Sequence, residues 1–274
     1  MAELQPPMLS DRGLKRLVGL GLALLVTAAL LKLAVGVPEP GFLIFNRWGQ
    51  SAPTLWANLT QLGDTSVVFA LLAPVLFRHP RVYFAWLSAV PVGGAMSLML
   101  KRSLDWPRPA DVLTLDQFHV VGWVLNGRSF PSGHTITAVA LAVMVGLYWR
   151  SLPSAARVKP LWVGIALGLL ALGAAVSRMA VGAHWPTDLL AGTGVGLMAA
   201  AFAAWVLTRW SWQPGPWAQA CAALALLVTS WALMDRAWGE QEPGALVLTV
   251  AAMTVWVSLA HWAWQWGRGR LGQT

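Results

Sequence analysis

The sequence predicts an all-α protein built as a polytopic bundle of transmembrane helices. Of its 274 residues, 57% are hydrophobic and only 11% are charged, whereas about 25% of the residues in a soluble domain are charged. Apolar runs long enough to cross a hydrocarbon core of roughly 30 Å recur along the chain. The chain also contains 18 tryptophans, a residue type that concentrates at the membrane–water interface. These observations exclude an ordinary soluble domain.

Eight apolar runs are predicted to cross the membrane. They occupy residues 17–37, 65–77, 82–100, 134–149, 161–177, 187–208, 217–234 and 244–264. The sixth run contains Gly192, Gly194 and Gly196, and small residues at this spacing favour close contact with a neighbouring helix. Lys32 lies in the outer half of the first run. We expect its long side chain to extend to the membrane surface, which is a structural role.

The segments between the runs give the domain organisation. Two polar loops, 101–133 and 178–188, hold many of the remaining charges. Residues 42–62 are rich in Trp, Asn and Gln and predict an interfacial, partly amphipathic helix. We divide the chain into a cytoplasmic N-terminal segment, a membrane core, and two additional spans with a short tail, at residues 1–16, 17–209 and 210–274.

The distribution of Lys and Arg predicts the orientation of the chain. Eight spans place both termini on one side of the membrane, and the loops on that side carry eleven basic residues. These are Arg12, Lys15, Arg16, Arg78, Arg81, Arg150, Arg157, Lys159, Arg209, Arg268 and Arg270. The opposite side carries seven, namely Arg47, Lys101, Arg102, Arg108, Arg128, Arg178 and Arg236. Because the cytoplasmic side carries the excess of basic residues, we expect cytoplasmic termini and outward-facing loops at 101–133 and 178–188.

The net charge of +8 does not predict a nucleic-acid partner. The basic residues are scattered between apolar runs instead of forming one patch, which is typical of topology signals and of contacts with anionic lipids. Cys221 is the only cysteine, so an intrachain disulfide is excluded.

His184 and Asp188 lie four residues apart where the fifth span passes into the sixth. Pro186 suits the first turn of the sixth span, which places Asp188 in that turn. The carboxylate can then accept the Nδ1–H of His184, which leaves Nε2 free to attack and favours the charged form of the imidazole. The alternative is that Asp188 only caps the helix and that His184 is an interfacial histidine.

Three cations and a second histidine belong to the same predicted membrane face. Lys101, Arg108 and Arg178 would repel one another in an empty pocket, so they indicate an anion with several oxygen acceptors, such as phosphate. Ser132 and Gly133 precede the fourth span, where the N–H groups of a helix start attract anions. The adjacent His134 can protonate a leaving oxygen. No cage of metal ligands accompanies these residues, so no metal and no cofactor is predicted.

The blocks K-x6-R-P, P-S-G-H and S-R-x5-H-x3-D, between Lys101 and Asp188, resemble those of the type 2 phosphatidic acid phosphatase superfamily. This superfamily also includes vanadium haloperoxidases and soluble bacterial acid phosphatases. All three blocks match in order and without substitution. The resemblance implies a six-span phosphatase core, so the spans at 217–234 and 244–264 are additional to it.

The resemblance also implies roles for the residues. His184 is expected to attack phosphorus and form a phosphohistidine, with Asp188 orienting the ring. His134 is expected to protonate the leaving group and then to activate water. The phosphoryl oxygens are expected to bind to the remaining residues of the blocks, Lys101, Arg108, Ser132, Gly133 and Arg178.

The expected protein is therefore a metal-independent lipid phosphatase, in a bacterial inner membrane and with its site on the outer face. Undecaprenyl pyrophosphate is the first candidate substrate, on fold-level analogy alone, and phosphatidylglycerophosphate and lipid A phosphates are others. A lipid phosphotransferase, for instance one acting on lipid A, would use the same residues. A non-catalytic membrane protein that binds lipid phosphate needs neither histidine, and a vanadate haloperoxidase is typically soluble. The sequence does not predict an oligomeric state.

Overall fold

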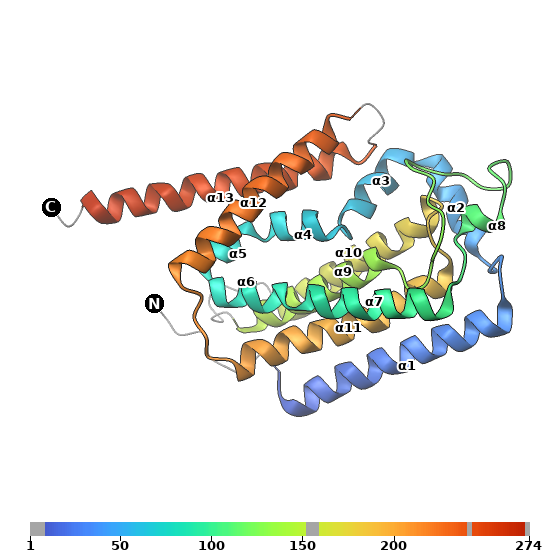
Figure 1. Cartoon of the computed structure of the whole chain (residues 1–274), viewed down its shortest axis with the longest axis horizontal. Helices are drawn as coiled ribbons and strands as arrows, with labels where there is room; N and C mark the ends of the chain where they lie inside the picture. Colours follow the sequence, from blue (N-terminus) through green and yellow to red (C-terminus); the bar gives the residue numbers. More distant parts are fainter. Residues whose placement is uncertain (1–8, 152–158, 240–242, 272–274) are drawn as a thin grey trace.

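The computed structural model describes residues 9–151, 159–239 and 243–271, and these form thirteen helices and no strand (Figure 1). The predicted all-α bundle is confirmed. The helices are α1 (Asp11–Val35), α2 (Phe42–Ser51), α3 (Pro53–Gln61), α4 (Thr65–Leu71), α5 (Ala73–Arg78), α6 (Pro80–Leu87), α7 (Ala89–Leu104), α8 (Pro109–Val112), α9 (Gly133–Ser151), α10 (Pro160–Ala180), α11 (Pro186–Arg209), α12 (Pro216–Ala237) and α13 (Ala245–Leu271).

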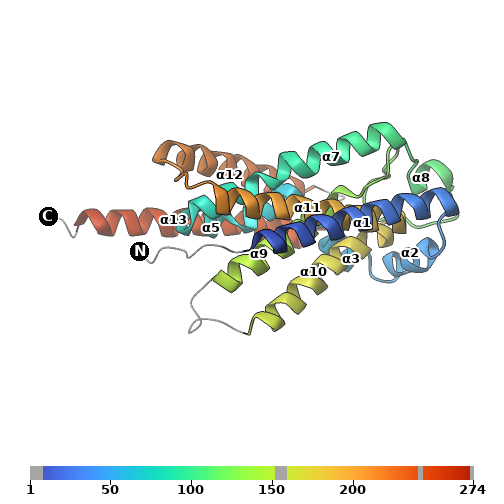
Figure 2. The same ribbon diagram turned by 90° about the horizontal axis from the view of Figure 1, so that it is seen from below.

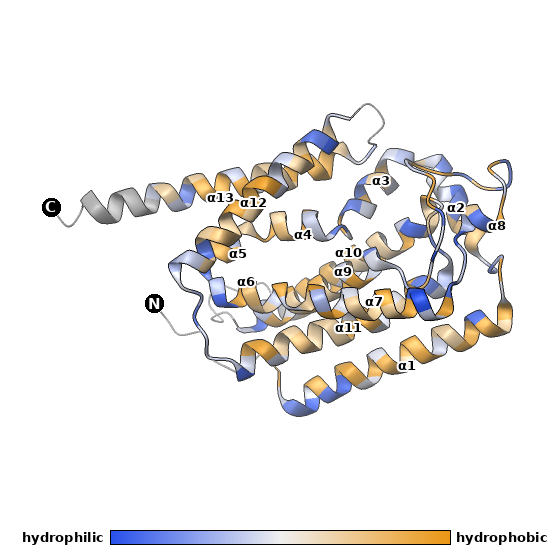
Figure 3. Cartoon of the chain, viewed as in Figure 1, coloured by the Kyte–Doolittle hydropathy of each residue, from blue (hydrophilic) through white to orange (hydrophobic). Residues whose placement is uncertain are grey.

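Six segments of the described chain are helical, long and apolar enough to cross a membrane, which fits an integral membrane protein. They are Asp11–Val35, Pro80–Leu104, Leu161–Ala180, Pro186–Arg209, Pro216–Ala237 and Ala245–Trp264. Hydrophobic residues run along these helices, and hydrophilic residues gather toward the ends of the bundle (Figure 3).

The other two predicted spans differ from these six. The run at 65–77 forms two short helices, α4 and α5, because the first ends at Leu71 and Pro74 lies in the first turn of the second, where a proline cannot continue a preceding helix. The run at 134–149 forms α9, which has 19 residues but carries polar residues in its first and last turns. Both segments are nevertheless part of the bundle, since α4 contacts α9 and α13, and α9 contacts α10 and α11.

Helix α11 packs between α1, α9 and α7 and is largely buried. Its glycines make this possible, as their spacing predicted. A Cβ atom added at Gly192 would lie 2.7 Å from the carbonyl oxygen of Ser132, and one at Gly196 would lie 2.8 Å from that of Ile136. Gly194 lies against Gly21 of α1, where an added Cβ on Gly21 would approach the Gly194 oxygen to 2.6 Å. Backbones at this distance leave no room for a side chain.

Helices α12 and α13 pack against each other and against α4 and α5. Leu226 and Leu233 of α12 and Leu248 of α13 are buried in one core cluster with Val67 and Leu76. The outward faces of both helices expose large side chains such as Trp231 (75% exposed) and Val257 (67%). An apolar face of this kind suits lipid rather than water.

The two polar loops lie at one end of the bundle, together with α2, α3 and α8 (Figures 1 and 2). The start of α1 lies toward the other end. The predicted interfacial helix near 42–62 is two helices, because Pro53 starts a new one after Ala52. The Asn46 amide of α2 is buried and donates to the carbonyl oxygens of His119 (2.8 Å) and Met179 (3.2 Å). Helix α2 therefore connects the last turn of α10 to the loop at His119.

Candidate active site

His184 lies in the tight turn between α10 and α11. The turn folds back on the last residues of α10, since the N–H groups of Ala183 and His184 both donate to the carbonyl oxygen of Arg178, at 2.9 and 3.2 Å. Gly182 makes this possible with a φ of +81°, and a Cβ there would lie 2.7 Å from the His119 oxygen. Only glycine adopts this conformation at little cost.

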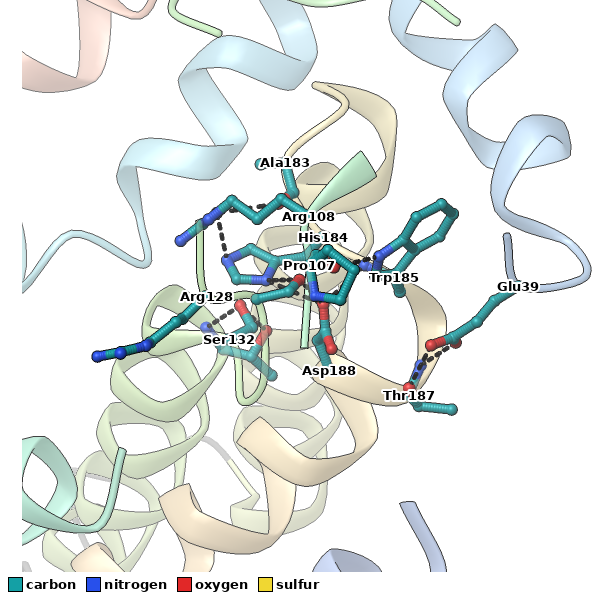
Figure 4. A network of polar contacts seen from close by, with 12 residues as sticks. Glu39, Pro107, Arg108, Arg128, Ser132, Ala183, His184, Trp185, Thr187 and Asp188 are labelled. Atoms are coloured by element: carbon teal, nitrogen blue, oxygen red, sulfur yellow. Dashed lines mark hydrogen bonds and ion pairs between the residues drawn. The ribbon is translucent and has the colours of Figure 1, made fainter. Parts of the chain in front are cut away.

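The carboxylate of Asp188 lies below the His184 ring, in the first turn of α11 (Figure 4). Its Oδ2 is 3.2 Å from His184 Nδ1 and accepts the Trp185 N–H at 2.9 Å. Asp188 is fully buried, and the Ser129 hydroxyl also donates to Oδ2. The same carboxylate oxygen thus caps the helix and faces the histidine, so capping is not the only contact that Asp188 makes.

The opposite nitrogen of the ring faces Arg108. Arg108 Nη1 lies 3.2 Å from His184 Nε2 and donates to the Ala183 oxygen at 2.9 Å. A guanidinium group has only donors, so Nε2 must present its lone pair and Nδ1 must carry the proton. The ring is therefore in the tautomer that leaves Nε2 nucleophilic.

Burial keeps this imidazole neutral. Desolvation lowers the pKa of His184 to about 3, and Arg108 and Arg178 act in the same direction, while the hydrogen bond and the charge of Asp188 raise it. We expected Asp188 to favour the charged form. That effect is present, but burial of the ring outweighs it in the described structure.

The three predicted cations come from different segments and lie close enough to act on one another electrostatically. Lys101, in the last turn of α7, donates from Nζ to the carbonyl oxygens of Arg128 (2.8 Å) and Ser129 (3.1 Å). Arg178, in the last turn of α10, is 5% exposed and donates to Thr60 Oγ1 at 2.5 Å. Its buried Nε has no hydrogen-bond partner within the described parts of the chain. An anion is the natural partner for such a group.

His134 lies in the first turn of α9 and lines two cavities. Arg178, His184 and Arg108 are close enough to act on it electrostatically. The first cavity, of about 500 Å³, is mostly apolar and is also lined by Lys101, Trp86 and Met144. The second, of about 690 Å³, is also lined by Arg178, Arg236 and Asp64. His134 is therefore placed where a charged group and an apolar chain can meet.

In the P-S-G-H block, Ser132 differs from the expectation that its backbone N–H binds an anion. Ser132 is fully buried, its N–H donates to the Asp188 carbonyl oxygen at 3.0 Å, and its hydroxyl accepts from Thr135 at 3.0 Å. The N–H of Ser132 is thus already bonded and is not free for an anion. The N–H groups of Gly133 and His134 lie in the first turn of α9, where a helix supplies no acceptor for them.

The sequence does not predict four polar residues of the site, namely Ser129, Thr60, Glu39 and Lys32. Lys32 is the clearest correction. We expected its ammonium at the membrane surface, but the residue is 2% exposed and its Nζ lies 2.9 Å from Asp188 Oδ1. A buried ammonium needs a partner, and the sequence signal was the isolated lysine in an apolar run. Ser129 and Thr60 carry no such signal.

The sequence pattern of the PAP2 superfamily matches residues 82–213 of the chain. Phosphatidylglycerophosphatase B of Bacillus subtilis is 34% identical over 168 residues, which cover 59% of this chain and 77% of that protein. The chain belongs to the PAP2 superfamily. Lipid A 1-phosphatase of Rhizobium etli is 26% identical over 225 residues, covering 77% of this chain and 84% of that protein.

Other PAP2 relatives are more distant or only partly covered. Phosphatidylglycerophosphatase B of Escherichia coli K12 is 29% identical over 175 residues, and this chain spans 66% of its length. The crystal structure of Aquifex aeolicus LpxE gives a TM-score of 0.45 at 22% identity, covering 64% of this chain and 92% of that one. That of a Bacillus subtilis PAP2-type phosphatidylglycerolphosphate phosphatase gives 0.47 at 23%, covering 67% and 91%.

The PAP2 match contains all three sequence blocks but not the whole site. Residues 82–213 include Lys101, Arg108, His134 and His184. They do not include α1 to α5. Lys32, Glu39 and Thr60, whose polar groups contact the site, therefore lie outside the match. They also exclude α12 and α13.

Proposed function

We propose that this chain is an integral-membrane, metal-independent lipid phosphatase that works through a phosphohistidine on His184. The observation that carries the proposal is the state of that ring. Its Nδ1–H faces Asp188 at 3.2 Å and its Nε2 faces Arg108 at 3.2 Å. A neutral, oriented imidazole among cations is what attack on a phosphoryl group requires.

Substrate binding prepares the nucleophile. The phosphoryl oxygens accept hydrogen bonds from Lys101, Arg108 and Arg178. When Arg108 turns to the phosphate, it releases Nε2 of His184. These positive charges neutralise the phosphate, a task that divalent metals perform in other phosphatases.

The first chemical step transfers the phosphoryl group to the enzyme. Nε2 attacks phosphorus while the bond to the lipid oxygen breaks, and the protonated ring of His134 gives that oxygen a proton. Burial and the neighbouring cations lower the pKa of His134, so the negative charge of the bound phosphate is what favours the protonated ring. The new N–P bond leaves positive charge on the His184 ring, which the Asp188 carboxylate stabilises.

The second step returns the site to its initial state. His134 takes a proton from water as the water oxygen attacks phosphorus. The N–P bond breaks, inorganic phosphate is formed, and the lone pair returns to Nε2. The net reaction consumes one water and yields phosphate and a lipid product.

A lipid substrate fits the first cavity, whose apolar wall meets Lys101 and His134. The relatives are named for phosphatidylglycerophosphate and for lipid A 1-phosphate, so we place these two lipids before undecaprenyl pyrophosphate. A bacterial inner membrane remains part of the proposal. Cytoplasmic termini and an outward-facing site do as well, and the charge asymmetry of the loops supports these two.

Phosphate release from the three lipids by the purified protein tests the proposal, with His184→Ala as the control. We expect release from at least one lipid by the wild type and none by the variant. An acceptor lipid added in a parallel reaction identifies a phosphotransferase, which would phosphorylate the acceptor. Binding of all three lipids without release would favour the non-catalytic alternative.

A further inference from the structure

Helix α1 supplies a buried cation to the site from outside the PAP2 match. Lys32 Nζ lies 2.9 Å from Asp188 Oδ1 and 2.8 Å from Glu39 Oε1. The Glu39 carboxylate in turn accepts the Thr187 N–H at 2.8 Å and the Thr187 hydroxyl at 2.5 Å (Figure 4). Glu39 and Lys32 are 5% and 2% exposed. The two side chains thus connect the start of α11 to α1.

The position of Lys32 is fixed by the packing of α1 on α11. The two helices run antiparallel (Figure 1). Arg209 and Asp11 pair at 2.9 Å at one end, and Gly21 lies against Gly194 in the middle. Lys32 lies at the other end, three helical turns after Gly21.

The surroundings of the ammonium hold it on the carboxylate. The rings of Trp106 and Trp185 lie 5.7 and 5.9 Å from Nζ, within the range of cation–π attraction. This cage leaves the ammonium with its two carboxylates and the two aromatic faces.

We propose that Lys32 is a positioning residue for phosphoryl transfer, acting through Asp188; this rests on the function proposed above. Asp188 Oδ2 serves His184, Ser129 and the Trp185 N–H, and Lys32 holds Oδ1. With both oxygens engaged, the carboxylate cannot rotate away from Nδ1. Loss of Lys32 leaves Oδ1 buried and unpaired, so the carboxylate turns or takes up a proton.

Glu39 prevents Lys32 from cancelling the charge of Asp188. One ammonium shared by two carboxylates leaves one net negative charge beside His184. That charge stabilises the positive ring of the phosphohistidine. Lys32 therefore orients Asp188 while Glu39 preserves its electrostatic effect.

The test compares Lys32→Met with the double variant Lys32→Met/Glu39→Gln. The double variant has no unpaired carboxylate at position 39 and keeps one negative charge at Asp188, as in the wild type. A loss of activity in this variant therefore reports the orientation of Asp188 and not a change in net charge. Lys15→Met is the matched control, because Lys15 is an exposed residue of the same helix. We expect the double variant to lose about 100-fold in kcat with little change in KM, the size of a 1 Å misplacement, and Lys15→Met to lose nothing.

A second measurement does not depend on activity. Nitrogen-15 NMR of histidine-labelled protein reports which ring nitrogen carries the proton, and His184→Gln identifies the signals. We expect Nδ1–H in the wild type and a mixture of tautomers in the double variant. Wild-type kcat in the double variant, or unchanged His184 nitrogen signals, would overturn the positioning role. Absence of phosphate release by the wild type would instead refute the proposed function, and the NMR result would still decide the role of Lys32.

Discussion

Arg108 Nη1 lies 3.2 Å from Nε2 of His184, on the edge of the ring opposite to Asp188. The lone pair that we expect to attack phosphorus is therefore occupied by a guanidinium until an anion replaces it. Arg108→Lys keeps the charge but loses the planar pair of donors that match phosphate oxygens. We expect an increase in KM and a decrease in kcat of about 10-fold or more, since an interaction with charged groups is worth about 1.5–3 kcal/mol. Steady-state kinetics with the preferred lipid measures both, and unchanged values would remove Arg108 from phosphate binding.

The roles of the two histidines can be distinguished by changing the leaving group of the substrate. General acid catalysis contributes about 10²–10⁴-fold, so His134→Ala should recover much of its lost rate with an activated aryl phosphate, whose leaving oxygen needs no proton. His184→Ala should recover nothing, because the nucleophile is missing. Asp188→Asn should fall between them, since it changes the tautomer without removing Nε2.

This comparison uses a single-turnover burst of leaving group, because His134 also activates water in the later step. A normal burst from His184→Ala would show that the nucleophile is another residue.

Metal chelation and vanadate test the role of the cations. Lys101, Arg108 and Arg178 provide the positive charge around the phosphate, so activity should persist in EDTA. Vanadate should inhibit competitively, because it resembles phosphate and adopts the geometry of the transition state. Loss of activity in EDTA that a divalent ion restores would contradict the proposed mechanism.

Gly63 is predicted to be intolerant of a side chain because it lies against His134. A Cβ at this position would be 2.7 Å from both the Cβ and the carbonyl oxygen of His134. Gly63→Ala should therefore displace the start of α9 and lower kcat for lipid substrates by about 10- to 100-fold. Gly168→Ala, where a Cβ meets nothing within 4 Å, is the control and should keep wild-type kinetics. Equal activity of the two variants would show that α9 adjusts freely.

Much of this arrangement follows from the sequence, and the rest depends on packing. Hydrophobic runs and the proline and glycine positions predict the long helices, and the three blocks predict which residues gather at one end. Lys32 shows where local reasoning stops. A lysine in an apolar run can reach the surface or pair inside the bundle, and its partner, Asp188, is 156 residues away. Only the contact between α1 and α11 decides whether the lysine reaches the surface or pairs inside the bundle.

Orientation in the membrane is tested by cysteine labelling. Gln117 is an exposed residue of the loop 101–133, and the excess of basic residues on the opposite side predicts that this loop faces outward. In a Cys221→Ser background, Gln117→Cys should react with an impermeant reagent in intact cells, and Ser154→Cys should not. Ser154 lies outside the described residues, so it serves only as a marker of the other side. The reverse pattern would invert the topology.

The antiparallel contact between Lys32 and Asp188 also sets an order of events during synthesis. The ammonium is inserted first, and its carboxylate partner is made 156 residues later. In the interval, α1 has neither Asp188 nor the glycine surface of α11, and of the two carboxylates that pair with the ammonium only Glu39 is present. Docking of α11 then supplies the second carboxylate, Asp188. A nascent chain that ends before α11 therefore carries an incomplete site, and enzyme activity begins only when this late helix is in place.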